Sequence, residues 1–319
     1  MVNGNSSYPL CIDHKKDDID ALGYLVPNYL IRKSLFDALR PYSNVEFMSN
    51  ISVEKVSTNQ LCGTVLLSTG KTVEAPLIVA ADSRFSSTRR MMGIAAGLYD
   101  FSRVALVCRM SHEKSNHFTA TECFNYERTL AILPMNEKHS SIVITVKTDL
   151  SEALLSMSEE QFNADVKQHL NARSGEMKLI GQRYSYPLVA VHAKRFIANR
   201  FALIGDAAVG MHPVTAHGFN LGIRGQHTLS QGIKSAWKNE GDIGSERVLS
   251  NYQTKHMRVT KPLYYGTNGL VRLYTNEAVP AKIARFVSLR LANNLSPIKQ
   301  LITNKLTEVE KEHEFSFPF

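Results

Sequence analysis

Two acidic residues stand where the sequence predicts that buried strands end. Residues 77–81 form a short apolar run that is followed by Asp82, and residues 201–204 form a second run that is followed by Gly205 and Asp206. Such runs are typical of strands covered on both faces in a parallel sheet. Ligands of open α/β sheets bind beyond the carboxyl ends of the strands. We therefore expect the two acids to accept hydrogen bonds from sugar or polyol hydroxyl groups, although such acids are also typical of helix caps and turns.

A predicted helix follows the second acid and begins near Gly218. A helix N-terminus presents unsatisfied N–H groups and about half a positive charge. The start of this helix is therefore a candidate site for an anion, or for a ring that becomes anionic. Its predicted apolar face is made by residues at helical spacing, namely Phe219, Ile223, Gln226, Leu229, Ile233 and Trp237.

The elements around these residues are predicted from the spacing of apolar positions. Residues 27–39 and 158–170 predict helices, the second with a capping box made by Ser158 and Gln161. Extended segments are predicted at 53–56, 64–67, 72–73, 104–110, 120–124, 142–146 and 184–191. Mixed strands, an antiparallel middle and a helical end predict an α/β fold combined with an α+β part.

Composition excludes several classes of protein. Of the 319 residues, 44% are hydrophobic and 21% charged, as in globular proteins that do not span a membrane. No apolar run reaches the length of a membrane-spanning helix, and no signal sequence is predicted. The four cysteines are widely scattered, which argues against a disulfide framework and a zinc site, and no metal site is expected. We expect a reducing, cytoplasmic location.

The net charge of +8 is concentrated near the C-terminus. Residues 251–305 contain nine Lys and Arg and one acid, Glu277, which gives +8 in that segment. A basic segment favours an anionic membrane surface, while a solvated helical face explains it equally well. No nucleic-acid-binding motif is present, so a nucleic-acid partner is not expected.

Three ordered motifs resemble those of the p-hydroxybenzoate hydroxylase class of FAD-dependent aromatic hydroxylases. The segment 205–208, Pro213 and the segment 218–222 resemble its second flavin-binding motif. Its Asp-Gly-x-x-Ser-x-x-Arg motif is matched by Asp82, Ser86 and Arg89, and the arginine that leads its Arg-x-x-Leu helix is matched by Arg32. The tail resembles the ubiquinone-biosynthesis branch at Tyr252, residues 269–274, Pro280 and Arg285.

This resemblance implies a fold and a division of the chain. Residues 1–98 and 195–250 would form an incomplete, Rossmann-like FAD-binding domain, with membership of the N-terminal strand in the substrate domain as an alternative. Residues 99–194 would form a substrate domain around an antiparallel sheet, and residues 251–319 a helical C-terminal region.

The resemblance also implies roles for single residues. Asp206, after Gly205, would bind the ribityl chain of FAD, and Arg32 would contact the pyrophosphate. The loop of Asp82 and Arg89 would lie near the flavin and the reduced nicotinamide. The backbone from Pro213 through Gly218 and Phe219 to Asn220 would hold the pyrimidine edge of the flavin. His217 is either a catalytic candidate that faces the flavin or substrate, or a structural loop histidine.

The implied activity is hydroxylation of the aromatic ring of a polyprenylated ubiquinone precursor through a flavin C4a-hydroperoxide, with NAD(P)H as reductant. The cofactor would perform the difficult step. The partners would be a lipid-like aromatic substrate and a membrane surface or ubiquinone-biosynthesis complex, which places the protein at the inner face of the membrane. The tail supplies apolar and basic residues for such a surface (Val271, Leu273, Ile283, Phe286, Leu289, Arg272, Lys282, Arg285 and Arg290), although ordinary helix packing explains them too. Another aromatic substrate is an alternative.

Several positions depart from the family pattern. Ser83 replaces a glycine of the first motif, Val209 replaces a common histidine, and Ala216 with His217 replaces a Gly-Gln pair. No Gly-x-Gly-x-x-Gly turn occurs in these 319 residues, and the first residue aligns very roughly 80 residues inside the family. We therefore expect weak FAD binding or none by this chain alone. A truncated non-catalytic product, a mis-assigned start and a separate N-terminal partner are the alternatives.

Overall fold

The computed structural model describes residues 2–3, 11–13, 20–125, 128–170, 175–276, 278 and 280–281. Its contacts divide the chain into two compact units. The first unit comprises Met1–Pro41, Ser102–Pro187 and Arg272–Phe319, and the second comprises Tyr42–Phe101 and Leu188–Val271. These units differ from the three predicted segments, and the division into FAD-binding and substrate domains stays a prediction.

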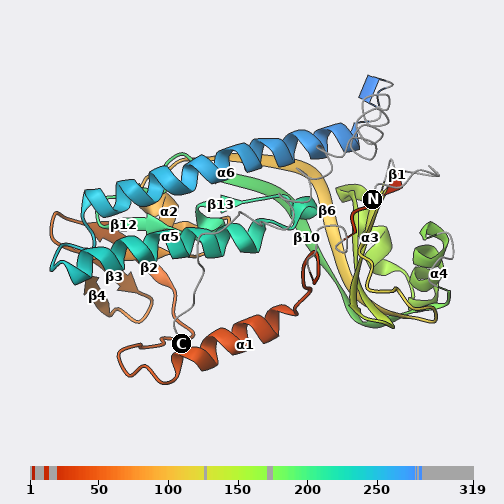
Figure 1. The fold of residues 1–319 in the computed structure, drawn as a ribbon, viewed down its shortest axis with the longest axis horizontal. Coiled ribbons are helices and arrows are strands. Elements are labelled where there is room, and N and C mark those ends of the chain that lie inside the picture. Colours follow the sequence, from red (N-terminus) through yellow and green to blue (C-terminus); the bar gives the residue numbers. More distant parts are fainter. Residues whose placement is uncertain are drawn as a thin grey trace. The chain divides into compact units, whose positions relative to one another are not determined.

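The first unit is built on an antiparallel sheet. Its strands are β1 (Val2–Asn3), β7 (Thr121–Asn125), β8 (Arg128–Asn136), β9 (His139–Lys147) and parts of the long strands β6 (Ala96–His112) and β10 (Met177–Ala193). The sheet order is β1-β7-β8-β9-β6-β10-β13, where β13 is Val209–Gly210 and β1 is parallel to β7. Helices α3 (Thr148–Ser156) and α4 (Glu159–His169) belong to this unit, as does α1 (Asn28–Leu39), which has no buried residue (Figure 1). The predicted capping box of Ser158 and Gln161 is present at the start of α4.

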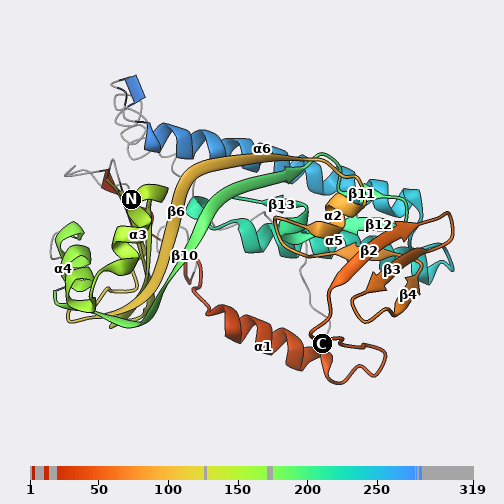
Figure 2. The same ribbon diagram turned by 180° about the vertical axis from the view of Figure 1, so that it is seen from behind.

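The second unit contains two small sheets and the two longest helices. Strands β2 (Val53–Thr58), β3 (Gly63–Leu67) and β4 (Thr72–Ala75) form an antiparallel sheet (Figure 2). The other sheet has the order β11 (Ile197–Ala198), β12 (Phe201–Leu203), β5 (Ile78–Ala80). The helices are α2 (Ser87–Met91), α5 (Gly218–Lys238) and α6 (Glu246–Thr275), and β13 (Val209–Gly210) pairs with β10.

Strands β5 and β12 are parallel neighbours, in the register Phe201↔Ile78, Ala202↔Val79 and Leu203↔Ala80. All three residues of β12 are fully buried. In β5, however, Val79 is 41% exposed, so the prediction that residues 77–81 are covered on both faces is wrong. Among the described residues, the apolar run of β5 packs on one face only. The prediction failed because a run of apolar residues does not show how many faces of the strand are covered.

Helix α5 buries only part of the face that its apolar residues predict, namely Leu229 and Ile233. Phe219 and Trp237 are 57% and 74% exposed, whereas Leu221, Gly225 and Leu229 are buried. Small residues make this close packing possible, since a Cβ on Gly225 would lie 2.7 Å from Nε2 of His256 on α6. Helix α6 is fixed further by Tyr252, whose hydroxyl donates to the carbonyl oxygen of Leu203 at the end of β12.

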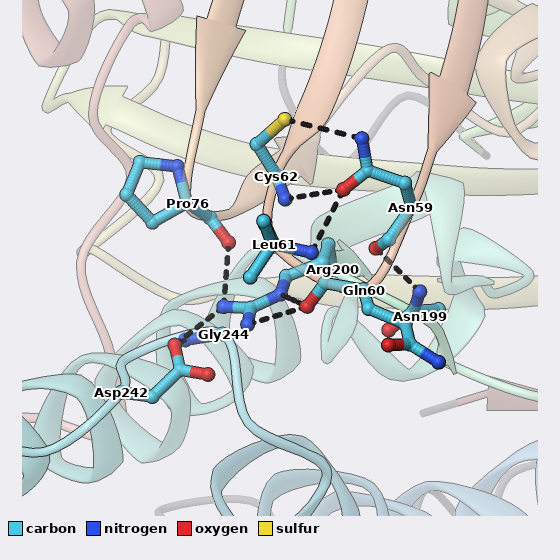
Figure 3. A network of polar contacts seen from close by, with 9 residues as sticks. All are labelled: Asn59, Gln60, Leu61, Cys62, Pro76, Asn199, Arg200, Asp242 and Gly244. Atoms are coloured by element: carbon cyan, nitrogen blue, oxygen red, sulfur yellow. Dashed lines mark hydrogen bonds and ion pairs between the residues drawn. The ribbon is translucent and has the colours of Figure 1, made fainter.

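Arg200 anchors the beginning of β12 (Figure 3). Its side chain is about 10% exposed, and its Nε and Nη2 donate to the carbonyl oxygen of Gln60 at 3.0 and 2.8 Å. Its Nη1 donates to the carbonyl oxygen of Pro76 at 3.3 Å and pairs with Asp242. One guanidinium thus joins three loops to the strand that leads to Asp206.

The predicted fold class, α/β combined with α+β, is confirmed. The parallel pair of β5 and β12 supplies the α/β part, and the antiparallel sheet of the first unit supplies the α+β part. Within the described part of the chain, no helix is long and apolar enough to cross a membrane. The predicted basic, apolar surface falls mostly on residues 282–290, which lie outside the described residues.

The buried imidazole of His256 predicts acid sensitivity. It is 3% exposed, and burial, with repulsion from Arg224 and His192, lowers its pKa from 6.5 to about 4. As the pH falls below 6.5, the imidazole of His256 is therefore protonated in the unfolded chain before it is protonated in the folded chain. The stability contributed by neutral His256 is complete above pH 6.5 and lost as the pH falls through about 4.

We expect the free energy of unfolding, measured with urea, to fall by roughly 3 kcal/mol from this group between those pH values. The His256→Gln variant should lose that part of the pH dependence, whereas exposed His117→Gln should keep it. An unchanged pH dependence in His256→Gln would contradict the assignment.

Candidate functional site

The parallel pairing of β5 and β12 brings the two predicted strand-end acids together. The N–H of Ile204 donates to the carbonyl oxygen of Ala80 at 2.9 Å, so the chain leaves both strands at the same edge. Beyond this bond, Arg84 Nη2 donates to Asp206 Oδ2 at 3.0 Å. The loop after β5 and the turn after β12 therefore form one site within the second unit.

The carboxylate of Asp82 is occupied within its own loop. Oδ1 accepts from the Ser86 hydroxyl at 2.5 Å, and Oδ2 accepts from the backbone N–H and the hydroxyl of Thr88, both at 3.0 Å. Burial opposes ionisation of Asp82, but these hydrogen bonds outweigh it and hold its pKa below the usual value. Asp82 thus holds the start of α2, whose N-cap is Ser86, and its hydrogen bonds favour the structural alternative for this acid.

Two arginines join this loop to the second motif. Arg89 is 4% exposed, and it donates to the carbonyl oxygens of Ala207 at 2.8 Å and Arg84 at 3.1 Å. Arg84 also donates to the carbonyl oxygen of Val189 on β10 at 3.2 Å. Arg89 therefore acts on the site by positioning backbone, and Arg84 by orienting the Asp206 carboxylate.

The start of α5 lies against the same turn. A Cβ on Gly222 would come within 3.5 Å of the Cα of Gly205, so helix and turn touch through their backbones. A Cβ on Gly205 or Gly218 would have no heavy atom within 4 Å, which marks an open surface there. The N–H groups of the first helical turn have no intrahelical acceptor, and Phe219 and Asn220 at this turn are exposed.

Two histidines flank the loop that precedes α5. His212 is 7% exposed; its Nδ1 accepts from the Val214 N–H at 3.2 Å, and its ring packs edge-on against Phe101 at 4.7 Å. Pro213 then starts a short 3-10 turn, Pro213–Thr215. His217 is also 7% exposed and directly precedes α5, and its role toward a ligand stays a prediction.

Two departures from the family pattern stand at positions whose backbone favours glycine. Ser83 has φ 75° and Ala216 has φ 53°, both in the left-handed region. The turns after β5 and before α5 thus carry backbone strain.

The structure brings together most of the residues that the sequence singles out. Within the second unit, the site contains Asp82, Arg89, Gly205, Asp206, Pro213, His217, Gly218, Phe219 and Asn220. Arg32 is exposed on α1 in the first unit, so its contact with a pyrophosphate stays a prediction. Sequence reasoning missed Arg84, which follows Ser83 inside the first motif and gives no periodic signal.

This arrangement fits a flat ring joined to a polyol. The open backbone at Gly205 and Gly218 admits a planar group, and the partly exposed Asp206 carboxylate, held by Arg84, can accept from a hydroxyl beside it. The N–H groups at the start of α5 attract negative charge. Among the described residues, no group of three or more His, Cys, Asp or Glu could hold a metal ion.

Comparisons with known proteins show the family of the chain. The family described as "FAD binding domain" matches residues 34–264. The chain is 45% identical over 311 residues to the ubiquinone hydroxylase UbiM of Neisseria meningitidis, covering 96% of this chain and 68% of that protein. It is 31% identical to the ubiquinone hydroxylase UbiL of Rhodospirillum rubrum, covering 94% and 70%.

A solved structure, p-nitrophenol 4-monooxygenase from Pseudomonas putida, shares the fold. The TM-score is 0.73 at 15% identity, covering 91% of this chain and 74% of that one.

The left-handed backbone at Ser83 predicts a stabilising substitution. The Ser83 side chain is exposed, so Ser83→Gly removes strain without removing a buried contact. We expect the free energy of unfolding to rise by up to about 1 kcal/mol. Ser57→Gly, in the extended strand β2, is the matched control and should lower it by about 0.5–1 kcal/mol. A loss of stability in Ser83→Gly would contradict the strain.

Proposed function

The chain belongs to the FAD-binding domain family of flavin-dependent monooxygenases, and we propose that it hydroxylates the aromatic ring of a polyprenylated ubiquinone precursor. The observation that carries this proposal is the convergence of Asp206, held by Arg84, with the open start of α5. The names of the relatives from Neisseria meningitidis and Rhodospirillum rubrum support the choice of substrate.

The residues of the second unit would hold the flavin half of FAD. Asp206 would accept from a ribityl hydroxyl while Arg84 holds its other side. The backbone from Pro213 to Asn220 would lie along the pyrimidine edge, where the first-turn N–H groups of α5 stabilise negative charge on the ring. Asp82 and Arg89 would keep the loop in place, and Arg32 would contact the pyrophosphate.

When bound, FAD supplies the electrons, delivered by NAD(P)H, that activate oxygen for transfer to the ring. The protein's part is to bind, to orient and to exclude water. The 319 residues contain no Gly-x-Gly-x-x-Gly turn, so the site described here contacts the flavin half and not the ADP half. We infer that this chain alone binds FAD weakly.

Flavin binding and turnover test this proposal together. With saturating FAD, NAD(P)H and a short-chain prenylated phenol, we expect one oxygen atom to be added to the ring, detected by mass spectrometry. Asp206→Ala should raise the dissociation constants of FAD and riboflavin by about tenfold or more, because a hydrogen bond to a charged group is lost. Turnover should recover at higher FAD concentration.

Glu74→Ala, which removes an exposed acid from β4, is the control for flavin affinity. Oxygenation of unprenylated phenols alone would favour another aromatic substrate. If the flavin-loaded chain forms no oxygenated phenol, the proposed activity is wrong and the alternative of a truncated, non-catalytic protein is favoured.

The substrate class suggests a membrane surface. A polyprenylated phenol resides in a lipid bilayer, and residues 251–305 carry a net charge of +8. We propose that this segment brings the protein to the anionic inner face of a membrane, alone or within a ubiquinone-biosynthesis complex.

In a flotation experiment, we expect the chain to rise with vesicles that contain phosphatidylserine and to be released by salt, because the attraction is electrostatic. Vesicles of neutral lipid are the comparison. A chain that stays at the bottom with both kinds of vesicle does not bind a membrane by itself.

A further inference from the structure

The antiparallel sheet of the first unit has two different faces. One face packs against α3 and α4 and forms a core with Leu106, Leu130, Ile144 and Phe162. Residues directly opposite each other on paired strands share a face, and consecutive residues alternate. The residues between these core positions therefore point away from α3 and α4.

One row on this second face crosses four strands. Its members are paired in the register Val107↔Val143, Ala131↔Val143 and Glu122↔Ala131. Three of the four side chains are small and apolar, and Ala131 is 8% exposed without belonging to the core under the helices. The row is thus a narrow apolar floor with a carboxylate at one end.

Glu122 is the charged member of this otherwise apolar row. Its side chain is half-buried in β7, and burial raises the pKa of its carboxyl from 4.5 to about 7, while the positive charge of the chain's N-terminal amino group acts in the opposite direction. Within the described residues, no hydrogen bond is donated to this carboxylate. Burying a carboxylate costs free energy that a structural acid normally recovers from a partner, as Asp82 does.

We propose that Glu122 binds the aromatic substrate by accepting a hydrogen bond from a phenolic hydroxyl, while the ring lies on Val107, Val143 and Ala131. The proposal rests on the proposed function for the class of substrate. A flat ring makes good contact with small side chains, and its hydroxyl group needs an acceptor once water is removed. Accepting this hydrogen bond also raises the electron density of the ring, which favours attack on an electrophilic oxygen.

The test distinguishes the contribution of the hydroxyl group to binding from that of the ring. 4-Fluorophenol and 4-fluorotoluene have nearly the same shape, and only the first can donate a hydrogen bond. Their dissociation constants are measured by ¹⁹F NMR on the full chain, with and without FAD. A pH of about 8.5 lies above the Glu122 pKa of about 7 and below the phenol pKa of about 10.

We expect the wild-type chain to prefer 4-fluorophenol by about tenfold or more, the size of a hydrogen bond to a charged group. Glu122→Leu should remove this preference and leave 4-fluorotoluene binding unchanged. Glu122→Gln, whose amide oxygen still accepts, should keep part of the preference. Glu137→Gln, in the exposed turn between β8 and β9, should behave as wild type.

The proposal is overturned if Glu122→Leu keeps the preference, if the wild type shows none, or if neither probe binds. Flavin affinity and its dependence on Asp206 are measured on the same Glu122 variants. They should be unchanged, because Glu122 and Asp206 belong to different units. Loss of flavin binding would instead count against the proposed function, so the two failures are distinguishable.

Discussion

The candidate site depends on the hydrogen-bonded pairing of two short parallel strands, β5 and β12. They come from segments more than 120 residues apart, and their register sets Leu203 beside Ala80. Because parallel strands end at the same edge of a sheet, this single pairing fixes where the loop of Asp82 and the turn of Asp206 emerge. Arg84 and Arg89 then add contacts between loop and turn that the strands have already brought within reach.

The sequence predicted the helices and strands better than it predicted their packing. The capping box at Ser158 is a local signal, and a local signal is sufficient for the start of a helix. The buried face of α5 is made by Leu221, Gly225 and Leu229, and a glycine that lets a helix approach carries no hydrophobic signal. Val79 shows the converse, since its apolar side chain is exposed. Arg84 was missed because an ion pair across 122 residues leaves no spacing to detect.

Two carboxylates illustrate how environment separates structural from functional roles. Asp82 accepts several hydrogen bonds from its own loop, so the ionised form is favoured and the group is satisfied without any ligand. Glu122 lies in an apolar row in which burial dominates, and its neutral form is favoured. A partly buried carboxylate that accepts no hydrogen bond within the described residues is a reason to expect a ligand. A conserved-looking motif around an acid is a weaker reason.

The anchoring of β12 by Arg200 has a consequence for sequence variation. Its guanidinium binds main-chain carbonyl oxygens of Gln60 and Pro76, which every amino acid provides. The amino acids at these two loop positions can therefore vary among relatives, whereas the arginine cannot. Gly244 is constrained for the opposite reason, because a Cβ there would collide with the Pro76 carbonyl oxygen and with Arg200. Among relatives, Arg200 and Gly244 should thus be retained while the residues of the surrounding loops vary.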